Sequence, residues 1–319
     1  MTQKPRPEKT GFFCFFRNMI RPPSLQKNDT IGIIAPGKKI EPGTVEEASR
    51  IIESWGLRVQ ISKNIFSTKH SYMAGTDDER LEDLQTMLDN PSVNAILCAR
   101  GGYGLTRIID RLDFNGFLKK PKWIGGFSDV TALHLKLQSL GVCSIHGTMP
   151  ILFSKSESTS SVESLRKILQ EGILPSISAV FDTANKMGEA SGSVVGGNLS
   201  LITDSLATPS EIDTKNKILI IEEIDEYFYK IDRMMVQLKR ANKLTNLAGL
   251  VVGYMSELKE TELPFGESAK EIILNHVKEF RYPVAFGFPT GHENPNLAWV
   301  EGSRATLKVT PENSQLTFA

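Results

Sequence analysis

The sequence predicts an α/β fold of two domains, in which a parallel-sheet domain precedes a domain of mixed strands and helices. One observation is the length of 319 residues, because domains average roughly 150 residues. A second is that short apolar runs alternate with amphipathic segments between residues 30 and 147, a pattern typical of a parallel sheet covered by helices. A third is that strands follow one another after residue 173 with fewer long helices between them.

The first domain is expected to contain five strands joined by helices. The run from Thr30 to Ala35 is continuously apolar and ends at Pro36, as a buried parallel strand does. Leu81, Leu84 and Leu88 recur at spacings of three and four, which indicates one face of a helix. The expected strands are 30–35, 58–62, 94–99, 122–126 and 142–145, and the expected helices are 46–55, 79–88 and one that begins near Val130.

A serine-rich stretch at 152–161 marks a change of pattern, and a short helix carrying Val162, Leu165 and Ile168 follows it. We therefore predict a flexible extension at 1–20, an N-terminal domain with the candidate nucleophile at 21–155, a linker region at 156–187 and a C-terminal domain at 188–319. Strands of the C-terminal domain are expected at 192–195, 218–221, 249–252, 284–286 and 305–309.

Composition excludes several classes of protein. Lys and Arg total 37 and Asp and Glu total 37, so the chain has no net charge with which to attract nucleic acid or anionic lipid. Cys14, Cys98 and Cys143 are too few and too scattered for a disulfide framework or a zinc site, which favours a reducing compartment such as the cytoplasm. No apolar run approaches the roughly 20 residues that cross a bilayer, although the aromatic run 12–16 leaves a peripheral membrane contact open.

A serine lies on an expected strand-to-helix turn, Gly125-Gly-Phe-Ser128-Asp129. Such a turn exposes the serine Oγ and places helix N-terminal N–H groups beside it, where they can stabilise an oxyanion. The alternative is that Ser128 or Asp129 is only the N-cap of the helix, the commonest role for these residues at that position.

A second turn, Arg100-Gly-Gly-Tyr-Gly104, follows the strand that contains Cys98. Its glycines allow a ligand to approach the backbone, and its N–H groups can bind an anion. A phosphate loop is an alternative, but no Gly-Lys-Ser/Thr ending follows, and a plain tight turn explains the glycines equally well. Cys98 is a weak candidate nucleophile, since a cysteine inside an apolar strand is usually inert.

Further candidates lie at the ends of other strands. His146 ends one strand, where a histidine is more often structural than catalytic. Glu222 and Glu223 end a buried strand, and a carboxylate there can orient a histidine, although a solvated charge run is the plainer reading. His292 follows Gly291 in a late loop and is a candidate general base or simply an exposed side chain. The chain order Ser, Glu, His is compatible with a catalytic triad.

An ordered set of motifs resembles the LD-carboxypeptidases, a family of serine peptidases that includes muramoyltetrapeptide carboxypeptidases and microcin C self-immunity proteins. The resemblance extends from about Arg21 to Leu307. The matching stretches are 21–25 (RPPSL), 29–36 (DTIGIIAP), 74–80 (AGTDDER), 99–104 (ARGGYG), 124–129 (IGGFSD), 146–147 (HG), 196–199 (GGNL), 229–234 (YKIDRM) and 287–292 (GFPTGH). One departure is Gly37, where the family often has serine, and it puts a hydroxyl contact to the ligand in doubt.

The resemblance implies a catalytic triad of Ser128, Glu222 and His292, with Glu223 as the less favoured carboxylate. It also implies an oxyanion hole formed by the backbone N–H groups of Gly102 and Asp129. The implied fold is a flavodoxin-like or amidotransferase-like N-terminal domain and a swivelling β/α C-terminal domain, usually in a homodimer. Arg100 and the backbone near Gly101 are candidates for binding the substrate carboxylate on charge alone.

The function implied is release of the terminal D-alanine from murein tetrapeptides during cell-wall recycling, with no metal, no cofactor and no nucleic-acid partner. Hydrolysis of a microcin C-like peptidyl-nucleotide is the alternative within the family, and it requires an aromatic platform for the base. The serine-rich segment offers only Phe153 for that purpose. A nucleotide-binding or flavin-binding module that uses the glycine-rich turns is the alternative from another class.

Overall fold

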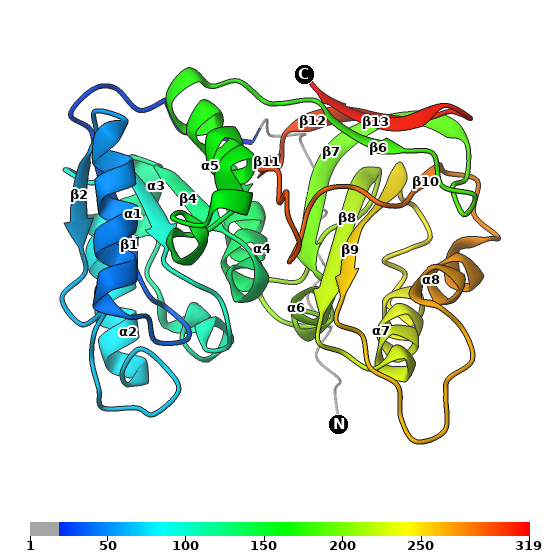
Figure 1. Ribbon diagram of the computed structural model, residues 1–319, viewed down its shortest axis with the longest axis horizontal. Helices are drawn as coiled ribbons and strands as arrows, with labels where there is room; N and C mark the ends of the chain where they lie inside the picture. The colour runs from blue at the N-terminus through cyan, green and yellow to red at the C-terminus, as the bar shows by residue number, and fades with distance from the viewer. Residues whose placement is uncertain (1–18) are drawn as a thin grey trace, which may run out of the picture.

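The protein, described by a computed structural model over residues 19–319, folds into two sheets that are each flanked by helices (Figure 1). The two-domain α/β architecture predicted from the sequence is confirmed. The predicted flexible extension, residues 1–20, lies outside the described residues except for Met19 and Ile20.

The first sheet contains, in spatial order, β2 (Arg58–Ile61), β1 (Thr30–Ile34), β3 (Ala95–Cys98), β4 (Trp123–Gly126), β5 (Ser144–His146) and β11 (Trp299–Glu301). Strands β1 to β5 are parallel, and their order is found in flavodoxin-like folds. The sixth strand, β11, is antiparallel to β5 and comes from the C-terminal half of the chain. The amidotransferase-like and swivelling descriptions of the two domains stay predictions.

Helices cover both faces of this sheet. One face packs against α1 (Pro42–Ser54) and α5 (Thr159–Arg166), and the other packs against α2 (Asp77–Asp89), α3 (Asn115–Lys119) and α4 (Thr131–Ser139). Strand β3 shows the two-sided burial, since Ala95 and Leu97 enter one core while Ile96 and Cys98 enter the other. Burial on both faces explains why β1, β3 and β4 are largely apolar in sequence.

Two helices begin earlier than the apolar periodicity predicts. Helix α1 begins at Pro42, because the fixed φ of proline suits the first turn and its missing N–H is not needed there. Helix α2 begins at Asp77, because Thr76 and Glu79 form a capping box with reciprocal side-chain to backbone hydrogen bonds of 3.2 and 3.0 Å.

The second sheet contains, in spatial order, β10 (Val284–Ala285), β9 (Gly249–Ser256), β8 (Lys217–Ile224), β7 (Gly188–Asn198), β12 (Arg304–Val309), β13 (Asn313–Phe318) and β6 (Ile177–Val180). Strands β7 to β10 are parallel, whereas β12, β13 and β6 are antiparallel, so the sheet is mixed as predicted. Helices α6 (Leu199–Asp204), α7 (Phe228–Arg240) and α8 (Ala269–Val277) pack on one face.

The two halves of the chain are closely interleaved. Of the residues placed in the linker region 156–187, those of α5 pack into the core of the first sheet and those of β6 join the second sheet. Strand β11 returns to the first sheet, and helices α4 and α6 lie between the two sheets in Figure 1. The carboxyl ends of β4 and β8 therefore contribute to one region between the domains, while the exact domain boundaries stay a prediction.

Candidate active site

Ser128 occupies a strained turn between β4 and α4. Its backbone φ is +65°, a conformation that costs a non-glycine residue about 1–3 kcal/mol. The side chain is partly exposed, and no side-chain cap is formed at the start of the 3-10 turn Ser128–Val130 or of α4. The N-cap alternative for Ser128 and Asp129 is therefore wrong, and the strain is consistent with a turn that presents the serine hydroxyl.

The glycine-rich turn that follows β3 lies directly against Ser128. A methyl group at Gly101 would be 3.0 Å from Ser128 Oγ, so only glycine permits this approach. Among residues 19–319, the backbone N–H groups of Gly102 and Asp129 donate to no protein acceptor. Two N–H groups beside a serine hydroxyl, both without a partner, are the arrangement that an oxyanion hole requires.

The Asp129 side chain ties the two turns together. Its Oδ2 accepts a hydrogen bond of 3.0 Å from the backbone N–H of Leu105, just beyond the glycine-rich turn. Burial of the carboxyl, which is 1% exposed, raises its pKa to about 6 against the lowering effect of the hydrogen bonds it accepts. This contact fixes the Ser128 turn relative to the N–H groups next to it.

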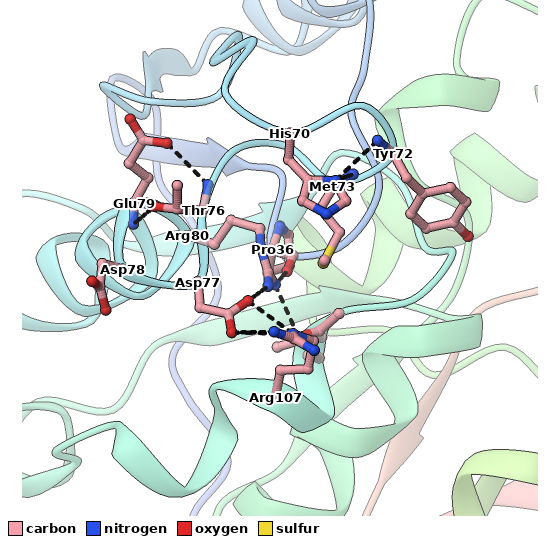
Figure 2. A network of polar contacts seen from close by, with 12 residues as sticks. Pro36, His70, Tyr72, Met73, Thr76, Asp77, Asp78, Glu79, Arg80 and Arg107 are labelled. Carbon is pink, nitrogen blue, oxygen red and sulfur yellow. Dashed lines mark hydrogen bonds and ion pairs between the residues drawn. The ribbon is translucent and has the colours of Figure 1, made fainter.

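Arg80, a buried residue of α2, forms hydrogen bonds with the glycine-rich turn and with the turn that follows β1. The guanidinium of Arg80 donates from Nη1 to the carbonyl oxygens of Gly104, at 2.9 Å, and Pro36, and it forms an ion pair with Asp77 (Figure 2). Arg107 binds the same Asp77 carboxylate with two further hydrogen bonds of 2.9 and 2.7 Å. Arg80 thereby joins the end of β1 to the end of the glycine-rich turn.

Glu222 and His292 meet at the end of β8. His292 Nδ1 lies 2.7 Å from Glu222 Oε2, and the glutamate is fully buried. The loop reaches Glu222 because Gly291 has φ +121° and no side chain, since a Cβ there would be 3.0 Å from Glu222 Cβ. The His292 ring packs 4.9 Å from the ring of Phe127, the residue before Ser128. The histidine is therefore beside the serine turn.

The charge of Glu222 controls the proton affinity of His292. Burial lowers the pKa of the imidazole, but the hydrogen bond and the negative charge of Glu222 outweigh burial and raise the pKa above its usual 6.5. A Nδ1–H that donates to Glu222 leaves Nε2 free to accept a proton, which is the tautomer that a general base needs.

Glu223 has a separate set of partners. Its carboxylate accepts hydrogen bonds from Asn198 Nδ2 at 2.8 Å and from the backbone N–H and the hydroxyl of Ser200 at 2.8 and 2.7 Å. Burial raises its pKa. Glu222, not Glu223, is thus the carboxylate that contacts the histidine.

Hydrogen bonds connect the two domains near the Ser128 turn, and they were not predicted from the sequence. The backbone N–H of Asn198 donates to Thr131 Oγ1 at 3.0 Å, and the Asn198 side chain continues to Glu223. Thr131 begins α4 three residues after Ser128, so this chain of contacts fixes the serine turn relative to the end of β8. The paired glycines at 196 and 197 were the available signal, because a methyl group at Gly197 would be 2.6 Å from Thr131 Oγ1.

The remaining candidates lie apart from these contacts. His146 is fully buried and stacks on Trp299 at 4.8 Å, and burial lowers its pKa well below the usual value. Cys98 is buried in β3, and burial raises its thiol pKa. The Arg100 guanidinium donates to the carbonyl oxygen of Lys39 at 3.1 Å. Within residues 19–319, no group of three His, Cys, Asp or Glu side chains could hold a metal, and no helix could span a membrane.

Comparison with known proteins decides the family. The model of the LD-carboxypeptidase N-terminal domain matches residues 31–147, and the model of the LD-carboxypeptidase C-terminal domain matches residues 191–307. This chain belongs to the LD-carboxypeptidase family. The serine carboxypeptidase activity predicted from the sequence is thereby confirmed for this LD-carboxypeptidase at the level of the family.

Relatives of this LD-carboxypeptidase cover nearly its whole length. A probable murein peptide carboxypeptidase of Bacillus subtilis (strain 168) is 36% identical over 92% of this chain and 93% of its own. The murein tetrapeptide carboxypeptidase of Pseudomonas aeruginosa is 25% identical over 87% and 92%. The crystal structure of muramoyltetrapeptide carboxypeptidase from Oxalobacter formigenes is similar with a TM-score of 0.82 and 27% identity, covering 91% of this chain and 98% of that one.

A structure of the microcin C7 self immunity protein MccF in its wild-type apo state has the same fold, with a TM-score of 0.82 at 19% identity over 93% of this chain and 98% of that one.

We expect Arg80→Lys to lower kcat of this LD-carboxypeptidase by about 10-fold to 100-fold, because a lysine cannot reach three acceptors at once and a shift of about 1 Å at a catalytic group has that cost. KM should change little, since Arg80 is 1% exposed and its guanidinium is engaged by protein groups. Steady-state assays give the two constants. The matched control is Arg111→Lys, because Arg111 pairs with exposed Asp78 of the same helix at 2.6 Å. Equal losses in both variants would contradict the expectation.

Proposed function

We propose that the chain releases the terminal D-alanine of murein tetrapeptides by a Ser128–His292–Glu222 mechanism. The observation that carries the proposal is the 2.7 Å contact between His292 Nδ1 and buried Glu222, beside the strained Ser128 turn. The names of the relatives from Bacillus subtilis and Pseudomonas aeruginosa support the murein peptide as substrate.

The proposed reaction is acyl transfer to the serine. Ser128 Oγ attacks the carbonyl carbon of the bond before D-alanine while His292 Nε2 takes the hydroxyl proton. Glu222 holds the Nδ1–H and stabilises the imidazolium that forms. The developing oxyanion accepts hydrogen bonds from the N–H groups of Gly102 and Asp129. His292 then returns the proton to the departing amine, and water hydrolyses the acyl-enzyme with the same residues.

The peptidyl-nucleotide alternative has weaker support. Phe153, the aromatic side chain that the serine-rich segment offers for stacking on a base, is 5% exposed and packs against Trp55 at 5.9 Å, so it does not fill that role. The likeness to the microcin C7 self immunity protein is below 25% identity and supports the fold alone.

The decisive experiment is product analysis with the purified chain. Murein tetrapeptide, the same peptide ending in L-alanine and a peptidyl-nucleotide are incubated separately with wild type and Ser128→Ala, and released amino acids and nucleotides are quantified. We expect D-alanine release from the first substrate only, and only by wild type. Release from the peptidyl-nucleotide alone would favour the alternative, and nucleotide binding without hydrolysis would contradict both peptidase proposals.

Chelators are expected to leave the activity intact, because the proposed serine, histidine and glutamate supply nucleophile, base and orientation without a metal. D-alanine release is measured after dialysis against EDTA and again after zinc is added back. Activity that is lost in EDTA and restored by zinc would contradict the proposed mechanism.

We infer in addition a cytoplasmic homodimer that acts in murein recycling. The exposed edge strand β6 supports the dimer, since its last residue, Val180, is an apolar side chain that is 84% exposed. The free, buried thiols of Cys98 and Cys143 are compatible with a reducing compartment. Sedimentation equilibrium tests the homodimer, which a monomer would contradict. Cell fractionation tests the cytoplasmic location, which recovery in an extracytoplasmic fraction would contradict.

A further inference from the structure

The turn that follows β1 lies between two loops at the candidate oxyanion hole. The backbone N–H of Lys38 donates to the carbonyl oxygen of Gly101 at 3.3 Å on one side. On the other side, the N–H of Lys39 donates to the carbonyl oxygen of Tyr72 at 3.1 Å, and Lys38 pairs with Met73 in an isolated antiparallel bridge. These backbone contacts hold Lys38 and Tyr72 next to each other and next to the glycine-rich turn.

The side chains of Lys38 and Tyr72 both border Gly102. A methyl group at Gly102 would lie 2.7 Å from Lys38 Cβ and 3.5 Å from the Tyr72 hydroxyl. Lys38 Nζ lies 5.0 Å from the centre of the Tyr72 ring. Because the preceding residue, Gly101, abuts Ser128, the ammonium and the phenol are placed beside the reacting centre rather than on a distant surface.

Both donors lack an acceptor in the described chain. Among residues 19–319, no carboxylate lies within 4.0 Å of Lys38 Nζ, and the Tyr72 hydroxyl donates to no protein group. The other cations near the glycine-rich turn are engaged, since Arg80 and Arg107 bind Asp77 and Arg100 donates to a carbonyl oxygen. A free ammonium beside a free phenol is a site for an anion.

The position of Tyr72 is fixed by a histidine that the mechanism does not use. His70 Nδ1 accepts hydrogen bonds from the backbone N–H groups of Tyr72, at 3.0 Å, and Met73, at 2.9 Å. Figure 2 shows the His70 ring beneath this loop and the Tyr72 ring projecting away from the Arg80 cluster. The tyrosine is thus held by the loop backbone, although its side chain is 40% exposed.

We propose that Lys38 and Tyr72 bind the C-terminal carboxylate of the peptide substrate. This role rests on the proposed function. In the sequence, charge alone had suggested Arg100 for it. In a carboxypeptidase substrate, only the amide nitrogen and Cα of the last residue separate this carboxylate from the scissile carbonyl. A carboxylate site must therefore adjoin the oxyanion hole, and Gly102 is shared by the two. Lysine beside tyrosine supplies a charge-assisted and a neutral hydrogen bond.

The test compares a peptide ending in D-alanine with the same peptide ending in D-alanine amide. Wild type should hydrolyse the acid with the higher kcat/KM. Lys38→Met should lower kcat/KM for the acid by about 10-fold to 100-fold, the range for loss of a hydrogen bond to a charged group, and affect the amide much less. Tyr72→Phe should lower the acid value by about 3-fold to 10-fold, the range for a neutral hydrogen bond. The ratio of acid to amide is unaffected by a general loss of folded protein.

Lys39→Met is the matched control, because Lys39 is adjacent and exposed, and Lys38, not Lys39, supplies the side-chain atoms next to Gly102. It should retain the wild-type ratio of acid to amide. The inference would be overturned if Lys38→Met kept the wild-type ratio of acid to amide, or if Arg100→Met abolished the preference for the acid instead. D-alanine release by wild type would still support the proposed function in either case. Hydrolysis of neither peptide by wild type would overturn the proposed function and this inference with it.

Discussion

Replacing Ser128 by alanine is expected to lower kcat for D-alanine release by about 10⁴-fold to 10⁶-fold, because the variant has no hydroxyl to attack the scissile carbonyl. The free energy of unfolding should change by less than about 0.5 kcal/mol, since the hydroxyl forms no cap and lies outside the core. Long incubations with product quantification measure the residual rate, and thermal unfolding measures the stability.

Ser139→Ala is the control for Ser128→Ala, because Ser139 is an exposed serine at the far end of the same helix, α4. It should keep wild-type turnover. A Ser128→Ala enzyme with near-native turnover would contradict the serine mechanism. A drop of about 1 kcal/mol in stability with activity retained would instead indicate a capping role that the structure does not display.

The fold was predictable where the pattern of burial is simple. Strands β1, β3 and β4 are buried on both faces, so their apolar runs are visible without any knowledge of their neighbours. Strands β6, β11 and β13 were missed because they are short and are defined by partners far away in the sequence. Strand β11 is three residues long and pairs with β5 of the first sheet, and β6 is four residues long and pairs with β13. Pairing between distant segments decides such strands, and local periodicity does not encode it.

The candidate site was predictable as a set of residue types but not as a set of contacts. The strand-end serine and glutamate and the loop histidine carry local signals, whereas the link from Thr131 through Asn198 to Glu223 joins three elements far apart in sequence. The N-cap reading of Ser128 failed because sequence cannot reveal a φ of +65°, which tertiary packing imposes. Likewise, nothing local distinguishes Lys38 from its neighbour Lys39.

Replacing Glu222 by glutamine is expected to lower kcat by about 10³-fold to 10⁴-fold with the fold retained, because a neutral amide can favour the wrong imidazole tautomer and cannot stabilise the imidazolium. The pH profile provides a second readout. Since Glu222 raises the His292 pKa, the acidic limb of kcat/KM in wild type should have its midpoint above 6.5, and in Glu222→Gln the midpoint should fall. Rates measured between pH 5 and 9 test both statements.

The contact between Glu222 and His292 also makes the free energy of unfolding depend on pH. A histidine whose pKa is raised in the folded state contributes its full stabilisation below the ordinary pKa and loses it as pH rises through the folded value. Glu222→Gln should therefore destabilise the protein more on the acidic side of the His292 titration than on the alkaline side, where the imidazole is neutral and competent as a base.

Glu223→Gln is the matched control for Glu222→Gln, because the two residues are adjacent and both buried but Glu223 contacts Asn198 and Ser200 instead of the histidine. This variant should lose some stability through its weakened hydrogen bonds, keep kcat within about 10-fold of wild type and keep the acidic limb in place. A larger loss of kcat in Glu223→Gln than in Glu222→Gln would assign the catalytic carboxylate to Glu223 despite its contacts with Asn198 and Ser200. An acidic limb that moves only in Glu223→Gln would lead to the same assignment.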